Sequence, residues 1–227
     1  MPTATAAATG SIRVPRGSTP TRLLDAAERL FAARGYANTS VREITREAAC
    51  NIAGINYHFG GKDQLYREVY ARRLAALRDA RLGALREVTT REAGRPSLEA
   101  VLEAFASSFL LPLSSRGEGR TLVDLMVREL AEPHLPLRMF RQLYAEPVQR
   151  ALADAMMAAT PGLGLDEAKA SATSLVAQLV HQVHVGRRDS PSAGQPTCPE
   201  TLARNIRHIV RFSAAGVRAC ASRGTLP

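Results

Sequence analysis

The side chains best suited to chemistry gather in one short segment, Asn51–Lys62. Asn56 can form hydrogen bonds with the edges of nucleic-acid bases, and Tyr57 and His58 can reach phosphate groups. Gly54 is small enough to let a helix approach a duplex closely. The segment therefore offers the groups that a DNA-reading surface requires.

Two short helices are needed to hold these side chains in a DNA groove. Ser40 and Glu43 have the spacing of a capping box, which predicts that one helix begins there. A second helix is expected over residues 52–58, and the pair Gly60-Gly61 ends it. The major groove of B-DNA is about 12 Å wide and admits one helix, so we expect the second helix to enter it.

The predicted DNA contacts have different chemical roles. Ser40 and Arg42 begin the first helix, where they suit contacts with the DNA backbone. Ile52 suits contact with a thymine methyl group, and Lys62 adds charge to helix amides that favour phosphate. The alternative is that the segment is only packed helix and loop. The predicted DNA-binding residues are Ser40, Arg42, Asn51, Ile52, Gly54, Asn56, Tyr57, His58 and Lys62.

Positive charge is concentrated in the same part of the chain. The net charge is +9. Residues 1–82 contain 13 Arg or Lys against 7 Asp or Glu, a net of +6, and the remainder contains 17 against 14, a net of +3. A basic surface favours a polyanionic partner without identifying it.

Apolar residues recur at helical spacing along most of the chain, and no segment shows the alternation of a strand, which predicts an all-α protein. We expect a disordered tail over 1–19 and a three-helix helix-turn-helix domain over 20–66. A connecting helix is expected over 67–93, followed by a second helical domain over 94–222. Gly94-Arg95-Pro96 marks the boundary between the two domains.

Single residues predict where helices begin and end. Gly35 follows the first helix as its C-terminal cap. Pro147 is expected to kink or restart a helix, and Pro199 to occupy the first position of the last helix.

Four segments have characteristic residues at a characteristic spacing. They are Phe31 with Gly35-Tyr36, Thr39–Ile44, Ile55–Phe59 and Lys62. Together they resemble the DNA-binding domain of TetR-family transcriptional regulators. Two further stretches have sequences similar to those of the CecR-like branch of that family. They are Asn51–Gly60, and Asp124–Glu129 with Glu132-Pro133. The sequence departs from the usual pattern at three places, Ala49, Cys50 and Gly60-Gly61.

Aromatic and methionine side chains recur on the helices after Gly94 and suit the lining of a ligand cavity. Such side chains more often form simple core, so the residues alone leave both interpretations open. The resemblance implies a pocket for a small-molecule effector of unknown identity. The candidate ligand-binding residues are Phe105, Phe109, Met126, Arg128, Phe140, Tyr144 and Met156.

The last two predicted helices offer a candidate dimer interface. His181 and His184 lie one turn apart, as metal ligands can, but no third ligand is near and valines flank them. The last helix has an apolar stripe that suits packing within the domain or between subunits, and the resemblance favours a homodimer. The predicted interface residues are His181, His184, Leu202, Ile206, Ile209, Ser213 and Gly216.

The composition argues against several other classes of protein. The three cysteines form no metal-spaced pair and no even set of disulfides. No apolar run reaches the ~18 residues that a membrane span needs, and the N-terminus has no signal-peptide core. We expect a cytoplasmic bacterial protein, nucleoid-associated when bound to DNA, with no cofactor, metal or catalytic residue.

Together these observations predict a homodimeric, ligand-responsive repressor that binds a near-palindromic operator in double-stranded DNA and is released by an effector. Two alternatives stay open. A helical enzyme with an accessory DNA-binding head would need a nucleophile–base pair or paired carboxylates, which the sequence does not offer. A non-specific DNA-binding protein would have a more uniform basic charge.

Overall fold

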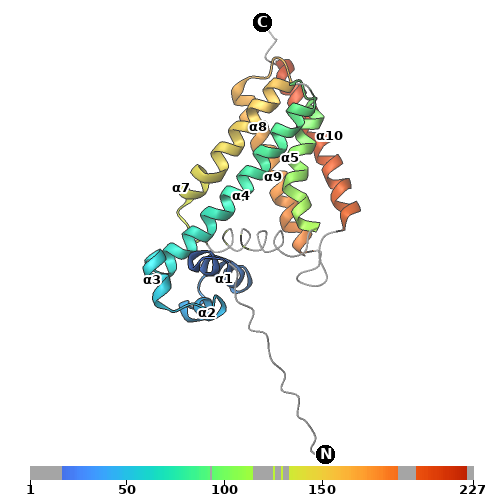
Figure 1. Ribbon diagram of the computed structural model, residues 1–227. Coiled ribbons are helices and arrows are strands. Elements are labelled where there is room, and N and C mark those ends of the chain that lie inside the picture. Colours follow the sequence, from blue (N-terminus) through green and yellow to red (C-terminus); the bar gives the residue numbers. More distant parts are fainter. Residues whose placement is uncertain are drawn as a thin grey trace, which may run out of the picture.

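The computed structural model describes residues 17–92, 94–114, 125, 129, 133–188 and 198–223, and every regular element within them is helical (Figure 1). The elements are α1 (Thr19–Arg34), α2 (Val41–Glu47), α3 (Ala53–Phe59), α4 (Lys62–Arg91), α5 (Leu98–Leu110), η1 (Leu111–Ser114), α7 (Leu137–Phe140), η2 (Arg141–Ala145), α8 (Glu146–Ala159), α9 (Leu165–Arg188) and α10 (Pro199–Arg223). The prediction of an all-α protein is confirmed.

Local signals in the sequence begin and end several helices. The hydroxyl group of Ser18 caps α1, and Gly35 ends it with a φ of 78°. The predicted capping box begins α2: the Ser40 hydroxyl accepts from the Glu43 N–H at 3.2 Å, and the Glu43 carboxylate accepts from the Ser40 N–H at 2.9 Å. Pro199 is the first residue of α10, as predicted.

One long helix, α4, belongs to two separate hydrophobic cores. Its first half contributes Leu65 and Val69 to the core of the N-terminal helices. Its last part contributes Leu85 and Val88 to the core of the C-terminal helices. Figure 1 shows α4 running from α3 at one end of the molecule along the length of the C-terminal helices. Because α4 is continuous, it fixes the orientation of the N-terminal helices relative to the C-terminal domain.

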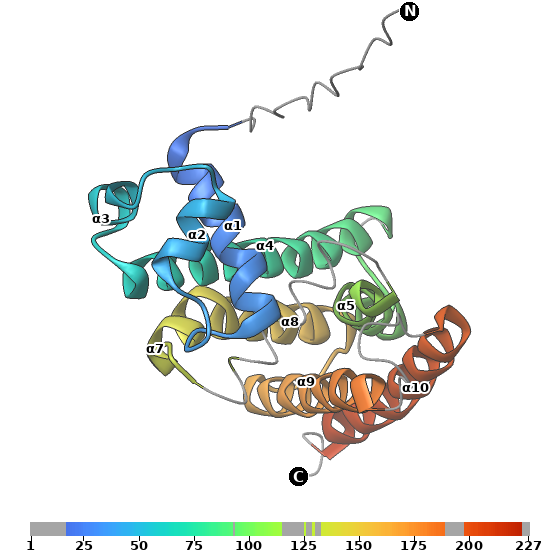
Figure 2. The ribbon, with the colours of Figure 1, turned by 90° about the horizontal axis from the view of Figure 1, so that it is seen from below.

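The second core lies among α5, α8, α9, α10 and the end of α4, which Figure 2 shows from below. Phe105 and Met156, both predicted to contact a ligand, are 0% exposed and pack within this core. Met126 and Arg128 lie outside the described residues. The predicted ligand-binding residues that are half-buried are Phe109, Phe140 and Tyr144.

The helix around Pro147 is interrupted, as the sequence predicts. α7 continues into the π-helical turn η2, in which the Glu146 N–H donates to the Arg141 carbonyl, before α8 resumes. Proline has no N–H, so the carbonyl of Leu143 cannot receive the usual helical hydrogen bond from Pro147. The wider turn moves Tyr144 relative to the register of a regular α-helix.

The prediction that Leu202, Ile206 and Ile209 face a partner subunit is wrong. These side chains are 2%, 5% and 3% exposed and pack in the second core of their own subunit. The apolar stripe of α10 is therefore intradomain packing, the alternative that its spacing had left open. Ser213 also points inward, because its hydroxyl group lies 3.3 Å from the Gln178 amide nitrogen of α9.

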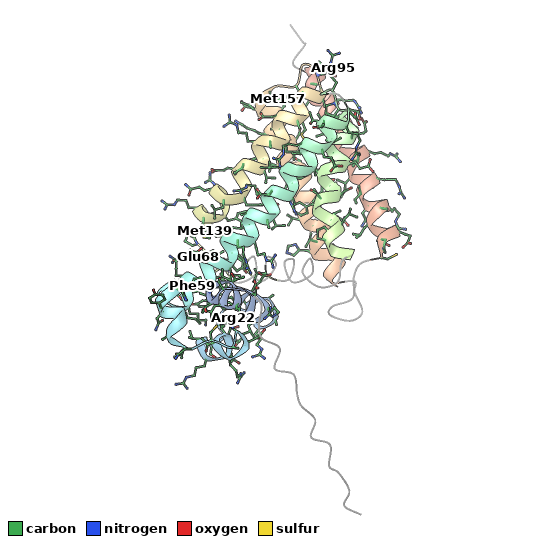
Figure 3. The ribbon with its side chains drawn as sticks, viewed as in Figure 1. Arg22, Phe59, Glu68, Arg95, Met139 and Met157 are labelled. Carbon is green, nitrogen blue, oxygen red and sulfur yellow. The ribbon has the colours of Figure 1, made fainter. Side chains whose placement is uncertain are left out.

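The two halves of the chain meet through a group of tyrosines on α4. The Tyr66 hydroxyl donates to the Glu129 carboxylate at 2.7 Å, and the Tyr70 hydroxyl donates to the Leu125 carbonyl at 2.7 Å. Met139 also packs against the N-terminal core, and Figure 3 labels it near the same end of the molecule as Glu68 of α4. The predicted boundary near residue 66 therefore divides the chain but does not separate the two halves in space.

Candidate nucleic-acid interface

The turn between α2 and α3 depends on an unusual backbone conformation. Ala49 has a φ of 51°, which places a non-glycine residue in the left-handed region. Its N–H donates to the Arg46 carbonyl, and the Cys50 N–H reaches back to the Thr45 carbonyl at 2.9 Å. The turn forms with alanine at Ala49, one of the places where the sequence departs from the usual family pattern, so the helix-turn-helix geometry is retained.

α3 is held by one deeply buried side chain and by its ends. Ile55 is 0% exposed and joins the N-terminal core with Ile44 of α2. Gly60 has a φ of 72° and its N–H donates to the Asn56 carbonyl, which ends the helix. A helix of this length is not stable alone. Its position is therefore set by Ile55 and by the packing of α1, α2 and α4.

The opposite side of α3 is open to solvent. Tyr57 is 85% exposed and Ile52 is 47% exposed, whereas most aromatic and large aliphatic side chains of folded proteins are largely covered. Asn56 and His58 are also exposed, and the rings of Tyr57 and His58 contact each other at 4.9 Å between centroids. The structure thus brings four of the predicted contact residues to one accessible surface, which we call the reading face (Ile52, Asn56, Tyr57 and His58).

Two predicted contact residues have structural roles at the starts of helices. The Asn51 side-chain oxygen accepts from the Ala53 N–H at 3.0 Å, so it caps the first turn of α3. The Ser40 hydroxyl belongs to the capping box of α2. Both side chains are exposed, and the Asn51 amide nitrogen remains available as a donor to DNA.

The predicted role of Gly54 is wrong. A Cβ atom built at this position would meet Leu23 Cδ1 at 3.7 Å and Thr19 Cγ2 at 3.9 Å, so this side of the half-buried Gly54 lies toward α1. These are ordinary van der Waals distances, so the position does not require glycine for space.

The start of α4 presents a lysine supported by an aromatic ring. The Lys62 ammonium nitrogen lies 4.0 Å from the centroid of Tyr36, a cation–π contact. The Tyr36 hydroxyl donates to Asp63, so the ring is itself held in place. Partial burial lowers the pKa of Lys62 from its ordinary value. Sequence reasoning used Tyr36 only within the family resemblance and missed this supporting role.

Charge pairs join α1 to α2, and Arg42 takes no part in them. Arg29 pairs with Glu47 at 2.8 Å, and Arg34 pairs with Glu43 at 2.7 Å. Arg42 is exposed and forms no ion pair with the described residues. Its charge is therefore available to a phosphate group beside α2.

The described ranges contain neither a candidate metal site nor a candidate membrane span. No group of three or more His, Cys, Asp or Glu side chains there is placed to hold a metal ion. His181 and His184 are exposed, and the His184 Nδ1 atom lies 3.0 Å from the Val180 carbonyl oxygen. No helix in the same ranges is both long and apolar enough to cross a membrane.

Comparisons with known proteins agree with this geometry. Residues 23–69 match the family described as "Bacterial regulatory proteins, tetR family", and residues 103–216 match "Tetracyclin repressor-like, C-terminal domain". An exposed reading helix joined to a helical C-terminal domain defines the class of DNA-binding transcriptional regulators. The chain belongs to the tetR family of these regulators, whose members are not enzymes. The matches do not distinguish branches, so the CecR-like resemblance stays a prediction.

A curated relative supports the N-terminal part. It is the probable HTH-type transcriptional regulator YttP of Bacillus subtilis (strain 168), with 44% identity over 48 residues. The match spans 21% of this chain and 23% of that protein, so it concerns the DNA-binding region alone.

Solved structures share the fold over most of the chain. A proposed TetR-family regulator from Mesorhizobium loti MAFF303099 has a TM-score of 0.66 and 17% identity, covering 88% of this chain and 96% of its own. A transcriptional regulator from Rhodococcus sp. Rha1 has a TM-score of 0.64 and 22% identity, covering 88% and 98%. A proposed regulator from Saccharomonospora viridis, solved in complex with choline, has a TM-score of 0.61 and 20% identity, covering 85% and 94%.

Proposed function

We propose that this chain is a ligand-responsive repressor that binds a near-palindromic operator as a homodimer. The observation that carries the proposal is the reading face of α3, because its side chains are exposed while Ile55 behind them is fully buried. A free aromatic side chain such as Tyr57 has no packing role within the subunit. In the proposed complex, contact with DNA covers this side chain.

The residues around α3 differ in which part of the duplex each of them can contact. Asn56 suits base edges, and Ile52 suits a thymine methyl group. Tyr57, Arg42 and Lys62 suit phosphate groups on either side of the groove. Phosphate contacts position the helix, whereas Asn56 and Ile52 would select the sequence.

A homodimer is supported by the outward surfaces of α9 and α10. Phe212 is 66% exposed, and Ala215, Gly216, His181 and His184 are exposed on the same pair of helices. α9 and α10 pack against each other, which would allow their exposed residues to contribute to a shared surface. We call this the α9/α10 surface. It replaces the buried stripe as the proposed contact between subunits.

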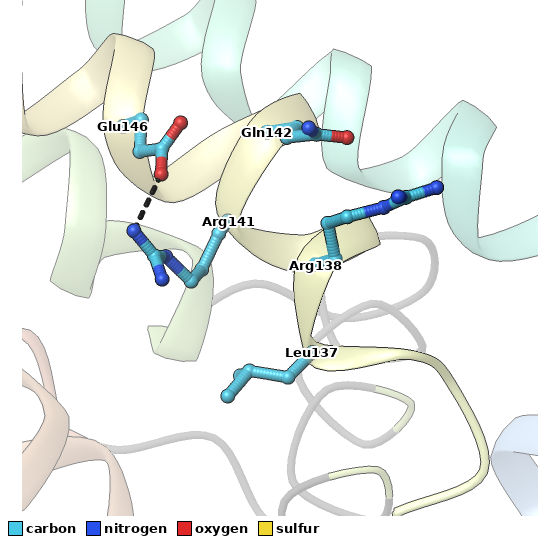
Figure 4. Close-up of a pocket in the computed structure, with 5 residues that line it drawn as sticks. All are labelled: Leu137, Arg138, Arg141, Gln142 and Glu146. Atoms are coloured by element: carbon cyan, nitrogen blue, oxygen red, sulfur yellow. Dashed lines mark hydrogen bonds and ion pairs between the residues drawn. The ribbon is translucent and has the colours of Figure 1, made fainter.

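The effector is proposed to bind in the C-terminal domain. Support comes from the half-buried aromatic side chains on α5, α7 and η2, and from the Saccharomonospora relative, which holds choline. Effector and operator would then oppose each other with a coupling of about 1–3 kcal/mol. A surface hollow of about 270 Å³, lined by Leu137, Arg138, Arg141, Gln142 and Glu146, is shown in Figure 4. None of the predicted ligand-binding residues lines it.

Selection from random DNA tests the proposal. The full-length protein should enrich two inverted half-sites whose centres lie about 34–36 Å apart, or a multiple of that distance. The matched control is Tyr57→Ala, which should enrich the same sequence more weakly. Recovery of unrelated sequences, or of a single asymmetric site, would contradict the operator proposal and favour the non-specific DNA-binding alternative.

A further inference from the structure

An arginine occupies a core position of α4. The buried residues Leu74, Leu77, Arg81, Leu85 and Val88 follow one another at helical spacing, and the third of them is charged. Arg81 is only 4% exposed. Arginine is among the residues least often buried completely, so this position calls for an explanation.

Arg81 has no charged partner among the described residues. Its Nη1 atom donates to the Leu77 carbonyl at 3.5 Å, a long hydrogen bond, and its Nε atom has no hydrogen-bond partner. Two aromatic residues also contact it: the guanidinium carbon lies 4.7 Å from the Phe109 ring centroid and 5.8 Å from the Tyr144 ring centroid, and a polar interaction with the Tyr144 side chain partly opposes the effect of burial on the pKa of Arg81. Burial lowers the pKa of Arg81 from its ordinary value.

The same helix provides a direct comparison. Arg72 donates to Asp25 at 2.8 Å and to Glu28 at 2.7 Å, so its charge is neutralised by two carboxylates. These pairs fasten α4 to α1 and explain why Arg72 is present. No such pairing within the described part of the chain accounts for Arg81.

Burying a cation without an anion destabilises a folded protein, and an apolar side chain of similar volume would avoid that cost. Residues that weaken the folded state for no structural gain are typical of functional sites. Arg81 therefore resembles a cation whose anionic partner is not part of the described structure. That partner would be an anion that arrives from outside the subunit.

The surroundings of Arg81 indicate what the rest of such an anion would contact. Phe109 and Tyr144, whose rings lie over the guanidinium group, are half-buried. Phe140 stands beside Tyr144 at 5.4 Å between centroids. Tyr144 belongs to the π-helical turn η2, and such turns are frequent at functional sites. Among the described residues, the side chains around the Arg81 guanidinium group are therefore aromatic, and the charge there is positive.

We propose that Arg81 binds the carboxylate group of an organic effector whose apolar part contacts Phe109, Phe140 and Tyr144. A guanidinium group holds a carboxylate through two parallel hydrogen bonds, and the free Nε–H of Arg81 supplies one of the donors. The inference rests on the ligand response proposed above and adds the charge of the ligand. A quaternary ammonium compound such as choline would be repelled at this position.

Matched pairs of acids and amides test the charge. We would measure binding of benzoate against benzamide, and of octanoate against octanamide, by isothermal titration calorimetry on the full-length protein. At least one acid should bind about ten-fold or more tightly than its amide, and Arg81→Met should remove that preference. The control variant is Arg138→Met. Arg138 is an exposed arginine of α7, so this variant should keep the preference for the acid. Equal binding of acid and amide, or no binding of either acid at millimolar concentration, overturns the proposal.

Thermal unfolding without ligand gives a second, independent test. Arg81→Met should unfold at the same temperature as the unmodified protein or at a higher one, because it removes an unpaired buried charge. Arg72→Met should unfold at a lower temperature, because it removes the cation of Asp25 and one of the two arginines that pair with the buried Glu28. A clear fall in the unfolding temperature of Arg81→Met would show that the guanidinium group is structural and would overturn the proposal.

Failure of this inference is distinguishable from failure of the proposed function. If an uncharged compound releases the operator and Arg81→Met responds to it equally, the ligand response stands and the carboxylate inference falls. If benzoate or octanoate binds through Arg81 but leaves operator affinity unchanged, the binding site stands and the proposed ligand response falls.

Discussion

The backbone of Ala49 is held at a φ of 51°, where its Cβ atom lies close to the carbonyl group of its own residue. Ala49→Gly should therefore stabilise the protein by about 0.5–1 kcal/mol, since glycine adopts this conformation without that contact. Chemical denaturation measures the change. The control Ala37→Gly, at an exposed position without positive φ, should be neutral or slightly destabilising. A loss of stability in Ala49→Gly would contradict the strain argument.

Three side chains of the interface should differ in what their removal does. Tyr57→Ala and Lys62→Ala should weaken binding to all DNA sequences alike, because phosphate contacts carry no sequence information. Asn56→Ala should relax base preference at a cost of roughly 1–3 kcal/mol. Competition assays with operator variants measure both effects. Unchanged affinity in the Tyr57 and Lys62 variants would count against the assignment of these residues.

At the scale of the elements, the contact between α4 and the second half of the chain depends on a hydrogen bond to a carboxylate. Tyr66 is 4% exposed, and its hydroxyl donates to Glu129, whose other oxygen accepts from the N–H groups of His134 and Leu135. Burial, then Tyr70 and Glu129, raise the pKa of Tyr66, which keeps its hydroxyl protonated as a donor.

Tyr66→Phe should lower the free energy of unfolding by about 1–3 kcal/mol, because one Glu129 oxygen loses its partner. Tyr57→Phe is the matched control, since the Tyr57 ring is 85% exposed and its hydroxyl contributes nothing to folding of the subunit. Equal stability of the two variants in urea denaturation would show that the junction does not depend on this bond.

Local sequence signals predicted the elements well for a physical reason. Ser40 with Glu43, Gly35, Pro147 and Pro199 act within one helical turn, so their effect is visible without knowledge of the fold. The same signals do not say which way a side chain turns. Gly54 was misjudged because its surroundings depend on the packing of α3 against α1, whereas the Asn51 cap is a local hydrogen bond that the position of an asparagine before α3 could have revealed.

At the scale of the whole molecule, periodicity identified apolar faces but not the surfaces that cover them. Leu202, Ile206 and Ile209 form a stripe that could pack equally well against a partner subunit or within its own subunit. In the structure it packs within its own subunit. Arg81 carried a sequence signal, a charge within an apolar stripe, but only the structure shows that its charge has no described partner.

The α9/α10 surface makes assembly testable with one substitution. A Cβ atom at Gly216 would meet nothing within 4 Å, so Gly216→Arg should fold normally as a subunit while placing a charge on the proposed dimer contact. Sedimentation should show a dimer for the unmodified protein and a monomer for the variant, with weaker operator binding. A monomeric unmodified chain at micromolar concentration would refute the dimer. Full operator binding by a monomeric variant would separate assembly from DNA binding.

The chain contains five tyrosines and no tryptophan, so its intrinsic fluorescence comes from tyrosine alone. Tyr57 lies on the reading face, Tyr36, Tyr66 and Tyr70 lie at the junction of the two halves, and Tyr144 lies in η2. Each region therefore carries its own optical reporter. Replacing one tyrosine at a time with phenylalanine would assign the emission, and events at the duplex, the junction and the C-terminal domain could then be timed separately without an attached dye.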